Sequence, residues 1–66
     1  MTDIVSQLKH RRKERHITQV KLAELSGVSL SVVKSIESGS KRVSFENLEK
    51  VLSVFGLTLS LQETKN

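Results

Sequence analysis

The sequence predicts a small all-α domain in which four short helices share one hydrophobic core. One observation is a pattern that occurs three times: an apolar residue, then Ser or Thr, then an apolar residue four positions further on. This pattern is typical of a helix N-cap with its hydrophobic staple. The second observation is that proline is absent and three glycines stand about one helix length after these starts, where a left-handed residue can close a helix.

Each helix follows from a local signal. Ile4, Val5 and Leu8 share one helical face, which predicts a first helix over residues 3–15. The other three helices are predicted over 19–26, 30–38 and 45–55, from the starts Ile17-Thr18 with Leu22, Val28-Ser29 with Val33, and Val43-Ser44 with Leu48, and from the ends at Gly27, Gly39 and Gly56.

The connections between these helices are only a few residues long. Consecutive helices must therefore turn sharply against each other and bury their apolar faces together. We expect one shared core made of Leu8, Ile17, Leu22, Ala23, Val28, Val33, Ile36, Leu48, Val51, Leu52 and Phe55.

The C-terminal residues follow a different pattern. Leu57, Leu59 and Leu61 alternate with polar residues, and a period of two is a strand signal. A lone strand has no partner in a helical chain, so we expect it to pair with the same strand of a second copy about a two-fold axis. The alternative is an extension packed loosely on the last helix. The predicted organisation is a helical domain at 1–56 and a dimerisation strand and tail at 57–66.

Composition and charge narrow the function classes. The 66-residue chain has no cysteine, which leaves no disulfide framework or thiolate metal site. No apolar run is long enough to span a membrane and the N-terminus lacks a signal-peptide pattern, so we expect a cytoplasmic protein. The net charge is +4, and five of the eleven Lys and Arg residues fall between Lys9 and Arg15. Such a cluster indicates either a polyanionic partner or a solvated helix end whose cations complement the helix dipole.

The connection between the second and third helices contains Gly27, four residues after Ala23 and six before Val33. A small residue lets two helices cross closely, glycine permits the turn, and a branched apolar residue anchors the second helix to the core, as in a helix-turn-helix. With these features the sequence resembles the lambda-repressor-like (XRE-type) DNA-binding domains over residues 4–56. The resemblance rests on Leu8 with Arg12, on the stretches ITQVKLAELSGVS and VVKSIESG, and on Leu48 with Val51-Leu52.

The third helix has an unusual outer face. A helical wheel places Val33, Ile36 and Glu37 on one side and mostly serines on the other. Serine is a mediocre helix former, but its short side chain lets a helix approach base edges in the DNA major groove. A merely tolerated solvated face is the alternative. The resemblance implies base contacts by Ser29, Leu30, Ser31, Val32, Lys34 and Ser35. Leu30 either touches a thymine methyl or turns into the core, and Lys34 can reach either a guanine edge or a phosphate.

We expect a contact with the DNA backbone at the first turn of the second helix. Thr18 to Val20 present unpaired N–H groups at the positive end of a helix dipole, which favours a phosphate. The resemblance implies that Gln19 grips this phosphate, and capping alone is the alternative. Such contacts supply salt-sensitive affinity without reading sequence. The expected phosphate contacts are Thr18, Gln19, Ser38, Lys41, Arg42 and Asn47.

Arg12 needs a partner of opposite charge. It lies within about 60° of Val5 and Leu8 on the apolar side of the first helix, where an unpaired cation is costly. Glu37 lies one turn beyond Val33 on the buried side of the third helix. The resemblance implies that arginine and glutamate pair at these two places, so we expect a structural ion pair between Arg12 and Glu37.

One copy of such a domain buries too little surface for tight specific binding, which favours a homodimer on an inverted repeat of double-stranded DNA. The predicted function is therefore a transcriptional repressor. The short chain with its LTLSL tail most resembles HipB-type antitoxins, which implies repression of its own operon and a HipA-like kinase toxin as partner. A phage or mobile-element regulator of the same fold and a protein-interaction module with weak DNA binding are the alternatives.

An enzyme is not expected. His10 and His16 stand six apart without a cysteine or an acidic pair spaced as metal ligands, so we expect surface histidines, no metal and no cofactor. Phe45 and Phe55 are the only aromatic residues. We place both toward the core, which leaves no surface for stacking RNA bases.

Overall fold

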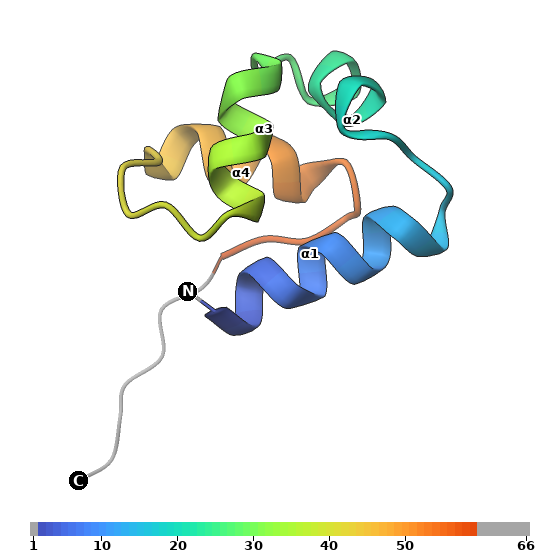
Figure 1. Ribbon diagram of the computed structural model, residues 1–66, viewed down its shortest axis with the longest axis horizontal. Helices are drawn as coiled ribbons and strands as arrows, with labels where there is room; N and C mark the ends of the chain where they lie inside the picture. The colour runs from blue at the N-terminus through green and yellow to red at the C-terminus, as the bar shows by residue number, and fades with distance from the viewer. Residues whose placement is uncertain (1, 60–66) are drawn as a thin grey trace, which may run out of the picture.

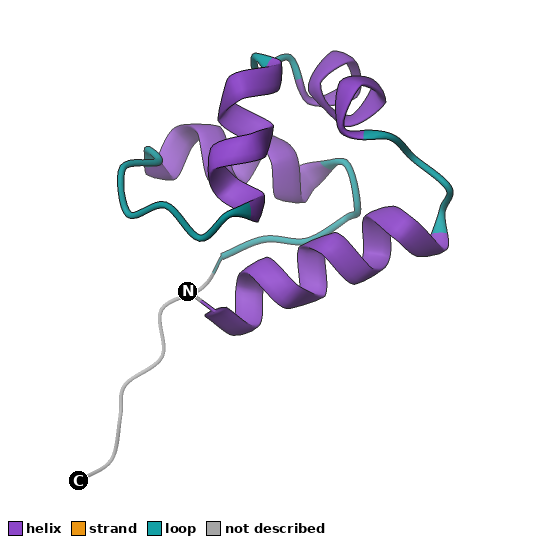
Figure 2. Cartoon of the chain, in the orientation of Figure 1, coloured by secondary structure: helices purple, strands orange, loops and turns teal. Residues whose placement is uncertain are grey.

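The computed structural model describes the backbone of residues 2–59 and the side chains of residues 4–59. Within this part of the chain it has helices and loops and no strand (Figure 2). No helix in these residues is long and apolar enough to cross a membrane. The predicted four-helix fold is confirmed, with every helix end within two residues of its predicted place: α1 (Thr2–Glu14), α2 (Gln19–Ser26), α3 (Leu30–Glu37) and α4 (Phe45–Ser53).

The last three helices begin at the caps predicted from the sequence. In each case the hydroxyl oxygen of the cap residue accepts a hydrogen bond from the backbone N–H three residues on, which satisfies a donor that the first turn leaves free. The caps are Thr18, Ser29 and Ser44, whose oxygens lie 3.0, 3.2 and 3.1 Å from the nitrogens of Lys21, Val32 and Asn47.

The ends of α1 and α2 both use a left-handed residue. Gly27 has φ +78° and donates its N–H to the Ala23 carbonyl at 3.0 Å, which closes α2 and starts the turn into α3. His16 takes the left-handed conformation after α1, with φ +54°, and is the one non-glycine residue with positive φ in the described part. Because it has a Cβ, His16 carries a conformational cost that Gly27 avoids.

One core joins all four helices. Nine of the eleven predicted core residues are buried, and Ile17 and Val28 pack against its edge while remaining half-buried. Both belong to the predicted staples at the starts of α2 and α3. The buried residues are Leu8, Leu22, Ala23, Val33, Ile36, Leu48, Val51, Leu52 and Phe55.

The helices are arranged around α3. It packs on α1, α2 and α4, and α4 lies behind α3 in the view of Figure 1. After α4 the chain runs back along α1 (Figure 1), where Leu57 and Leu59 pack partly buried against the core. Residues 57–59 form neither helix nor strand, so the predicted strand is not seen in the described part of this segment. Leu61 lies outside the described residues, and the pairing of this segment between two copies stays a prediction.

The prediction that Phe45 faces the core is wrong. Its side chain is 62% exposed, whereas Phe55 is only 5% exposed. Phe45 is the first residue of α4 and stands one turn before Leu48, the first buried residue of that helix. The argument against base stacking therefore holds for Phe55 only, whose ring lies under the Arg15 guanidinium at 5.1 Å from its centroid.

Candidate nucleic-acid interface

The helix α3 has two faces of different chemistry. Val33, Ile36 and Glu37 are buried, whereas Ser31 and Lys34 are exposed. The exposed face therefore carries hydroxyl groups and an ammonium group, which can donate hydrogen bonds to base edges or to phosphates. Its short side chains leave the helix axis free to come close to a partner surface.

The first turn of α3 is held by its own serines. The Ser29 oxygen caps the helix and lies 3.0 Å from the Ser31 oxygen. Leu30 and Val32 are half-buried and pack against the core, so each leaves part of its side chain open to a partner. Leu30 therefore contacts the core with one part of its side chain and leaves the other part exposed to solvent. Ser35, further along the helix, is half-buried.

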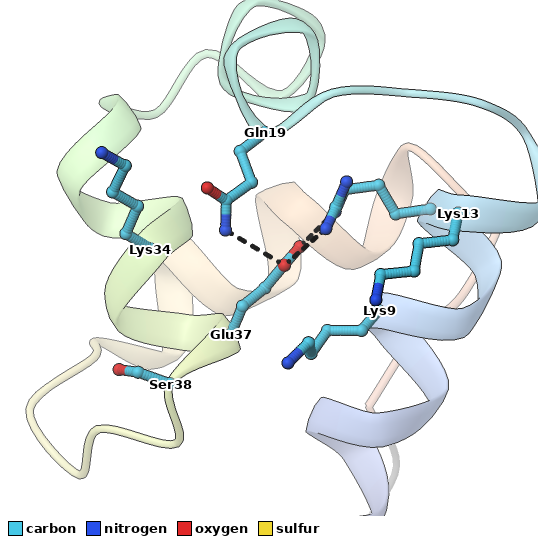
Figure 3. A pocket seen from close by; sticks show the side chains of 7 residues that line it. Lys9, Lys13, Gln19, Lys34, Glu37 and Ser38 are labelled. Carbon is cyan, nitrogen blue, oxygen red and sulfur yellow. Dashed lines mark hydrogen bonds and ion pairs between the residues drawn. The ribbon is translucent and has the colours of Figure 1, made fainter.

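The N-terminus of α2 lies against the buried side of α3. Thr18 is exposed, and Gln19 donates from its side-chain nitrogen to the Glu37 carboxylate at 3.2 Å. Figure 3 shows the Gln19 amide oxygen on the side away from Glu37. Sequence reasoning gave Gln19 a phosphate contact and missed this bond, because the bond depends on how α2 and α3 meet.

The structure has the ion pair that the sequence predicted between Arg12 and Glu37. Arg12 Nε and Nη2 donate to the two carboxylate oxygens of Glu37 at 2.6 and 2.9 Å, and Arg12 Nη1 donates to the Ile17 carbonyl at 2.8 Å. The two side chains are 12% and 3% exposed. This buried bidentate ion pair fixes the distance between α1 and α3. The bond from Arg12 to the Ile17 carbonyl also anchors the loop that leads into α2.

The ion pair stands beside an open pocket of about 470 Å³ between α1, the start of α2 and α3 (Figure 3). Lys9 and Lys13 extend from α1 on one side of the pocket, and Lys34 extends from α3 on the other side (Figure 3). Every residue that lines the pocket is polar or charged. They are Lys9, Arg12, Lys13, Gln19, Lys34, Glu37 and Ser38.

Lys9 was not among the candidate site residues chosen from the sequence. A signal was available, because Lys9 and Lys13 are four residues apart and therefore lie on one face of α1. What the sequence could not give is that this face of α1 and Lys34 line the same pocket. This depends on the crossing of α1 and α3.

The other residues expected to contact phosphates come after α3 in the sequence. Ser38 is exposed, but its hydroxyl donates back to the Ser35 carbonyl at 2.9 Å. Lys41 and Arg42 are exposed in the loop that leads to α4. Asn47 is half-buried in the first turn of α4, where its N–H donates to the Ser44 cap.

Comparison with known proteins gives three similarities. The family model HTH_3, described as helix-turn-helix, matches residues 8–62. The HTH-type transcriptional regulators PuuR of Escherichia coli (strain K12) and of Shigella flexneri are each 37% identical over 49 residues, which cover 74% of this chain and 26% of the relative. The chain thus aligns with about a quarter of the length of these curated relatives. A solved structure described as a toxin-antitoxin module from Streptococcus pneumoniae has a TM-score of 0.85 and 36% identity, covering 97% of this chain and 70% of the other.

Proposed function

The chain belongs to the XRE-type helix-turn-helix family, and from this premise we propose that it is a sequence-specific DNA-binding transcriptional repressor that places α3 in the major groove. The observation that carries the proposal is the division of α3 into a buried face and an exposed polar face that carries Ser31 and Lys34. In this proposal Ser29, Ser31 and Ser35 meet base edges, together with the exposed parts of Leu30 and Val32.

The contacts to the DNA backbone flank α3 in the proposal. Thr18 and Gln19 stand at the positive end of the α2 dipole, which attracts a phosphate. Lys41 and Arg42 follow α3 in an exposed loop, where their long cationic side chains can reach phosphates of the DNA backbone. Ser38 and Asn47 complete the set of proposed backbone contacts.

We propose that the active form is a homodimer on an inverted repeat. A single domain of this type buries roughly 600–1,000 Å² on DNA, which favours two copies for tight specific binding. The apolar residues Leu57, Leu59 and Leu61 are the proposed dimer contacts. Thr58 between them is exposed, so a Thr58→Pro variant removes a backbone donor from the proposed strand pairing while leaving the core residues in place. Light scattering should give about twice 7.4 kDa for the unmodified chain and a lower mass for this variant.

We further propose that the repressor is the antitoxin of a toxin-antitoxin pair. The support is the toxin-antitoxin module that aligns over 97% of this chain. The finer proposal is that the toxin is a HipA-like kinase and that the antitoxin represses their shared operon. Its support is the resemblance of the short chain and its tail to HipB-type antitoxins. Co-expression with the product of the adjacent reading frame tests both levels: rescue of growth supports an antitoxin, and a kinase activity in that product supports the finer assignment.

The DNA-binding proposal is tested by one charge placed on the exposed face of α3. Selection from a random duplex pool first provides a target sequence. Ser31→Glu should then weaken binding to that target by roughly tenfold or more, because a carboxylate faces acceptor-rich base edges and phosphates. The variant should fold normally, because an acidic residue in the first turn of a helix is favourable.

The matched control is Ser53→Glu, which adds the same charge to an exposed serine at the end of α4. Because Ser53 is at the opposite end of α4 from the proposed contact Asn47, this variant should bind the target within about twofold of the unmodified chain. Equal affinities of the two variants, with both folded by circular dichroism, would rule out α3 as the reading element.

A further inference from the structure

The pocket beside the Arg12–Glu37 pair carries an excess of positive charge. Lys9, Lys13 and Lys34 line it from two helices, and Glu37 is its one acidic residue. Both oxygens of that carboxylate already accept hydrogen bonds from Arg12, and one also accepts from Gln19. Among the described residues, no carboxylate lies within 4.0 Å of any of the three ammonium groups.

Three ammonium groups without a carboxylate partner in the described part of the chain line one pocket, and like charges near each other do not stabilise a fold. An anion in the pocket would remove the repulsion. The lining also disfavours an uncharged ligand, because small-molecule sites are usually lined mainly by apolar and aromatic side chains, and here every lining residue is polar or charged. The shared chemistry of the expected occupant is a phosphate group, which ammonium groups bind as point charges.

The location of the pocket indicates where the phosphate comes from. Lys34 belongs both to the lining of the pocket and to the exposed face of α3 (Figure 3). A duplex that takes α3 into its major groove brings a phosphate backbone along each side of the helix, since the groove is only about 12 Å wide. One of these backbones would then run past the mouth of the pocket between α3 and α1.

We propose that Lys9, Lys13 and Lys34 together hold one backbone phosphate of the bound DNA in this pocket. The inference rests on the proposed function and refines it in two respects. It adds α1 to the DNA interface through Lys9 and Lys13. It also assigns Lys34 to charge neutralisation, so that the reading of bases is left to the serines of α3.

The test compares pocket variants with a matched surface variant. The pocket variants are Lys9→Gln, Lys13→Gln, Lys34→Gln and the triple change. The control is Lys50→Gln on α4, which removes one charge from an exposed lysine that already lies 3.4 Å from Glu46. Fluorescence anisotropy gives the affinity for the selected target and for a scrambled duplex at several salt concentrations, and circular dichroism checks the fold.

The triple variant should lose roughly tenfold or more in affinity for both duplexes, by the same factor, because a phosphate contact does not read sequence. The slope of its log affinity against log salt concentration should be less steep by about 1 per bound subunit. The control should change neither quantity. The inference is overturned if the folded triple variant behaves like Lys50→Gln, or if Lys34→Gln weakens the selected target but not the scrambled duplex.

A second arm separates DNA phosphate from a free anion. Inorganic phosphate is titrated into the unmodified chain and the lysine signals are followed by NMR. Saturation well below 1 mM, together with an unchanged DNA salt slope in the triple variant, would assign the pocket to a free anion and overturn the inference. The proposed function fails separately, if the unmodified chain prefers no duplex sequence at all.

Discussion

The pair formed by Arg12 and Glu37 is the most consequential polar contact of single residues in the described core. Each side chain is nearly enclosed, and each finds its charge partner within 2.9 Å. Removing one member leaves the other buried without its charge partner, which costs about 3–5 kcal/mol in comparable pairs. A 66-residue domain has a total stability of only about 3–10 kcal/mol, so either loss is severe.

We therefore expect Arg12→Met and Glu37→Met each to lower the free energy of unfolding by about 3 kcal/mol. The double variant should cost less than the sum of the two by about 2 kcal/mol, because no charge is then left buried alone. Urea unfolding of the four proteins measures this coupling. Additive costs would show that the two side chains stabilise the fold independently, contrary to the geometry.

His16 is a residue whose backbone conformation costs stability. It has φ +54°, and its N–H donates to the Lys13 carbonyl at 3.0 Å at the end of α1. Glycine adopts this conformation without a Cβ penalty, so His16→Gly should raise the free energy of unfolding by about 0.5–1 kcal/mol.

The control for this prediction is His10→Gly, at an exposed position inside α1. There glycine adds backbone freedom to the unfolded chain and no strain is relieved, so the variant should lose about 1 kcal/mol. Thermal melts of both variants give the comparison. A loss of stability in His16→Gly would mean that the imidazole contributes more than the backbone strain costs.

The helices themselves were predictable because their start signals are local. The caps at Thr18, Ser29 and Ser44 depend on a hydroxyl group and an N–H only three residues away. Such a bond joins residues that are neighbours in the sequence, so its signal can be recognised without knowledge of the tertiary contacts. The order and limits of the elements therefore followed from short stretches of sequence.

Phe45 shows where this local reasoning stops. By helical angle it lies within about 20° of Leu52, so a wheel places it on the buried face of α4. It is nonetheless 62% exposed, because the first turn of α4 extends beyond α3 in Figure 1. A wheel gives the direction of a side chain around a helix but not how far along the helix its neighbours reach.

The turn between α2 and α3 should tolerate asparagine better than alanine at Gly27. The residue has φ +78°, yet a Cβ added there would meet no atom within 4 Å. The cost of Gly27→Ala is therefore conformational, about 1 kcal/mol, and no repacking is required. Gly27→Asn should cost less, because asparagine enters the left-handed region more readily.

Urea unfolding ranks the three proteins, and DNA affinity reports whether α3 has moved. Both variants should bind the selected target within about twofold of the unmodified chain, since the geometry of the turn is kept. A loss of binding without a loss of stability would show that Gly27 approaches the DNA directly.

At the scale of the molecule, the candidate interface combines predictable and unpredictable parts. The outward serines of α3 follow from a helical period and could be chosen from the sequence. The contact of Gln19 with Glu37 and the placement of Lys9 and Lys34 around one pocket could not, because they involve different helices and depend on crossing angles. The polar face of α3 was therefore predictable from the sequence, whereas the charged pocket at its side was not.

The salt dependence of DNA binding tests the interface and the assembly together. If each subunit contacts about four phosphates, a dimer on an inverted repeat should show a slope of log affinity against log salt near −7, and a single subunit about half of that. Between 50 and 200 mM salt the affinity of the dimer should then fall by about 10⁴-fold. The measurement requires a duplex with two half-sites about 34 Å apart and a control duplex with one.

The two duplexes make the outcomes distinct. A steep slope on the inverted repeat with two chains bound, and a slope of roughly half with one chain on the single site, supports a dimer whose subunits each use the backbone contacts. The same shallow slope on both duplexes would contradict pairing through Leu57 and Leu59. A slope near zero on both would contradict the cationic interface itself, since neither Lys34 nor the loop carrying Lys41 and Arg42 could then be displacing counterions from DNA.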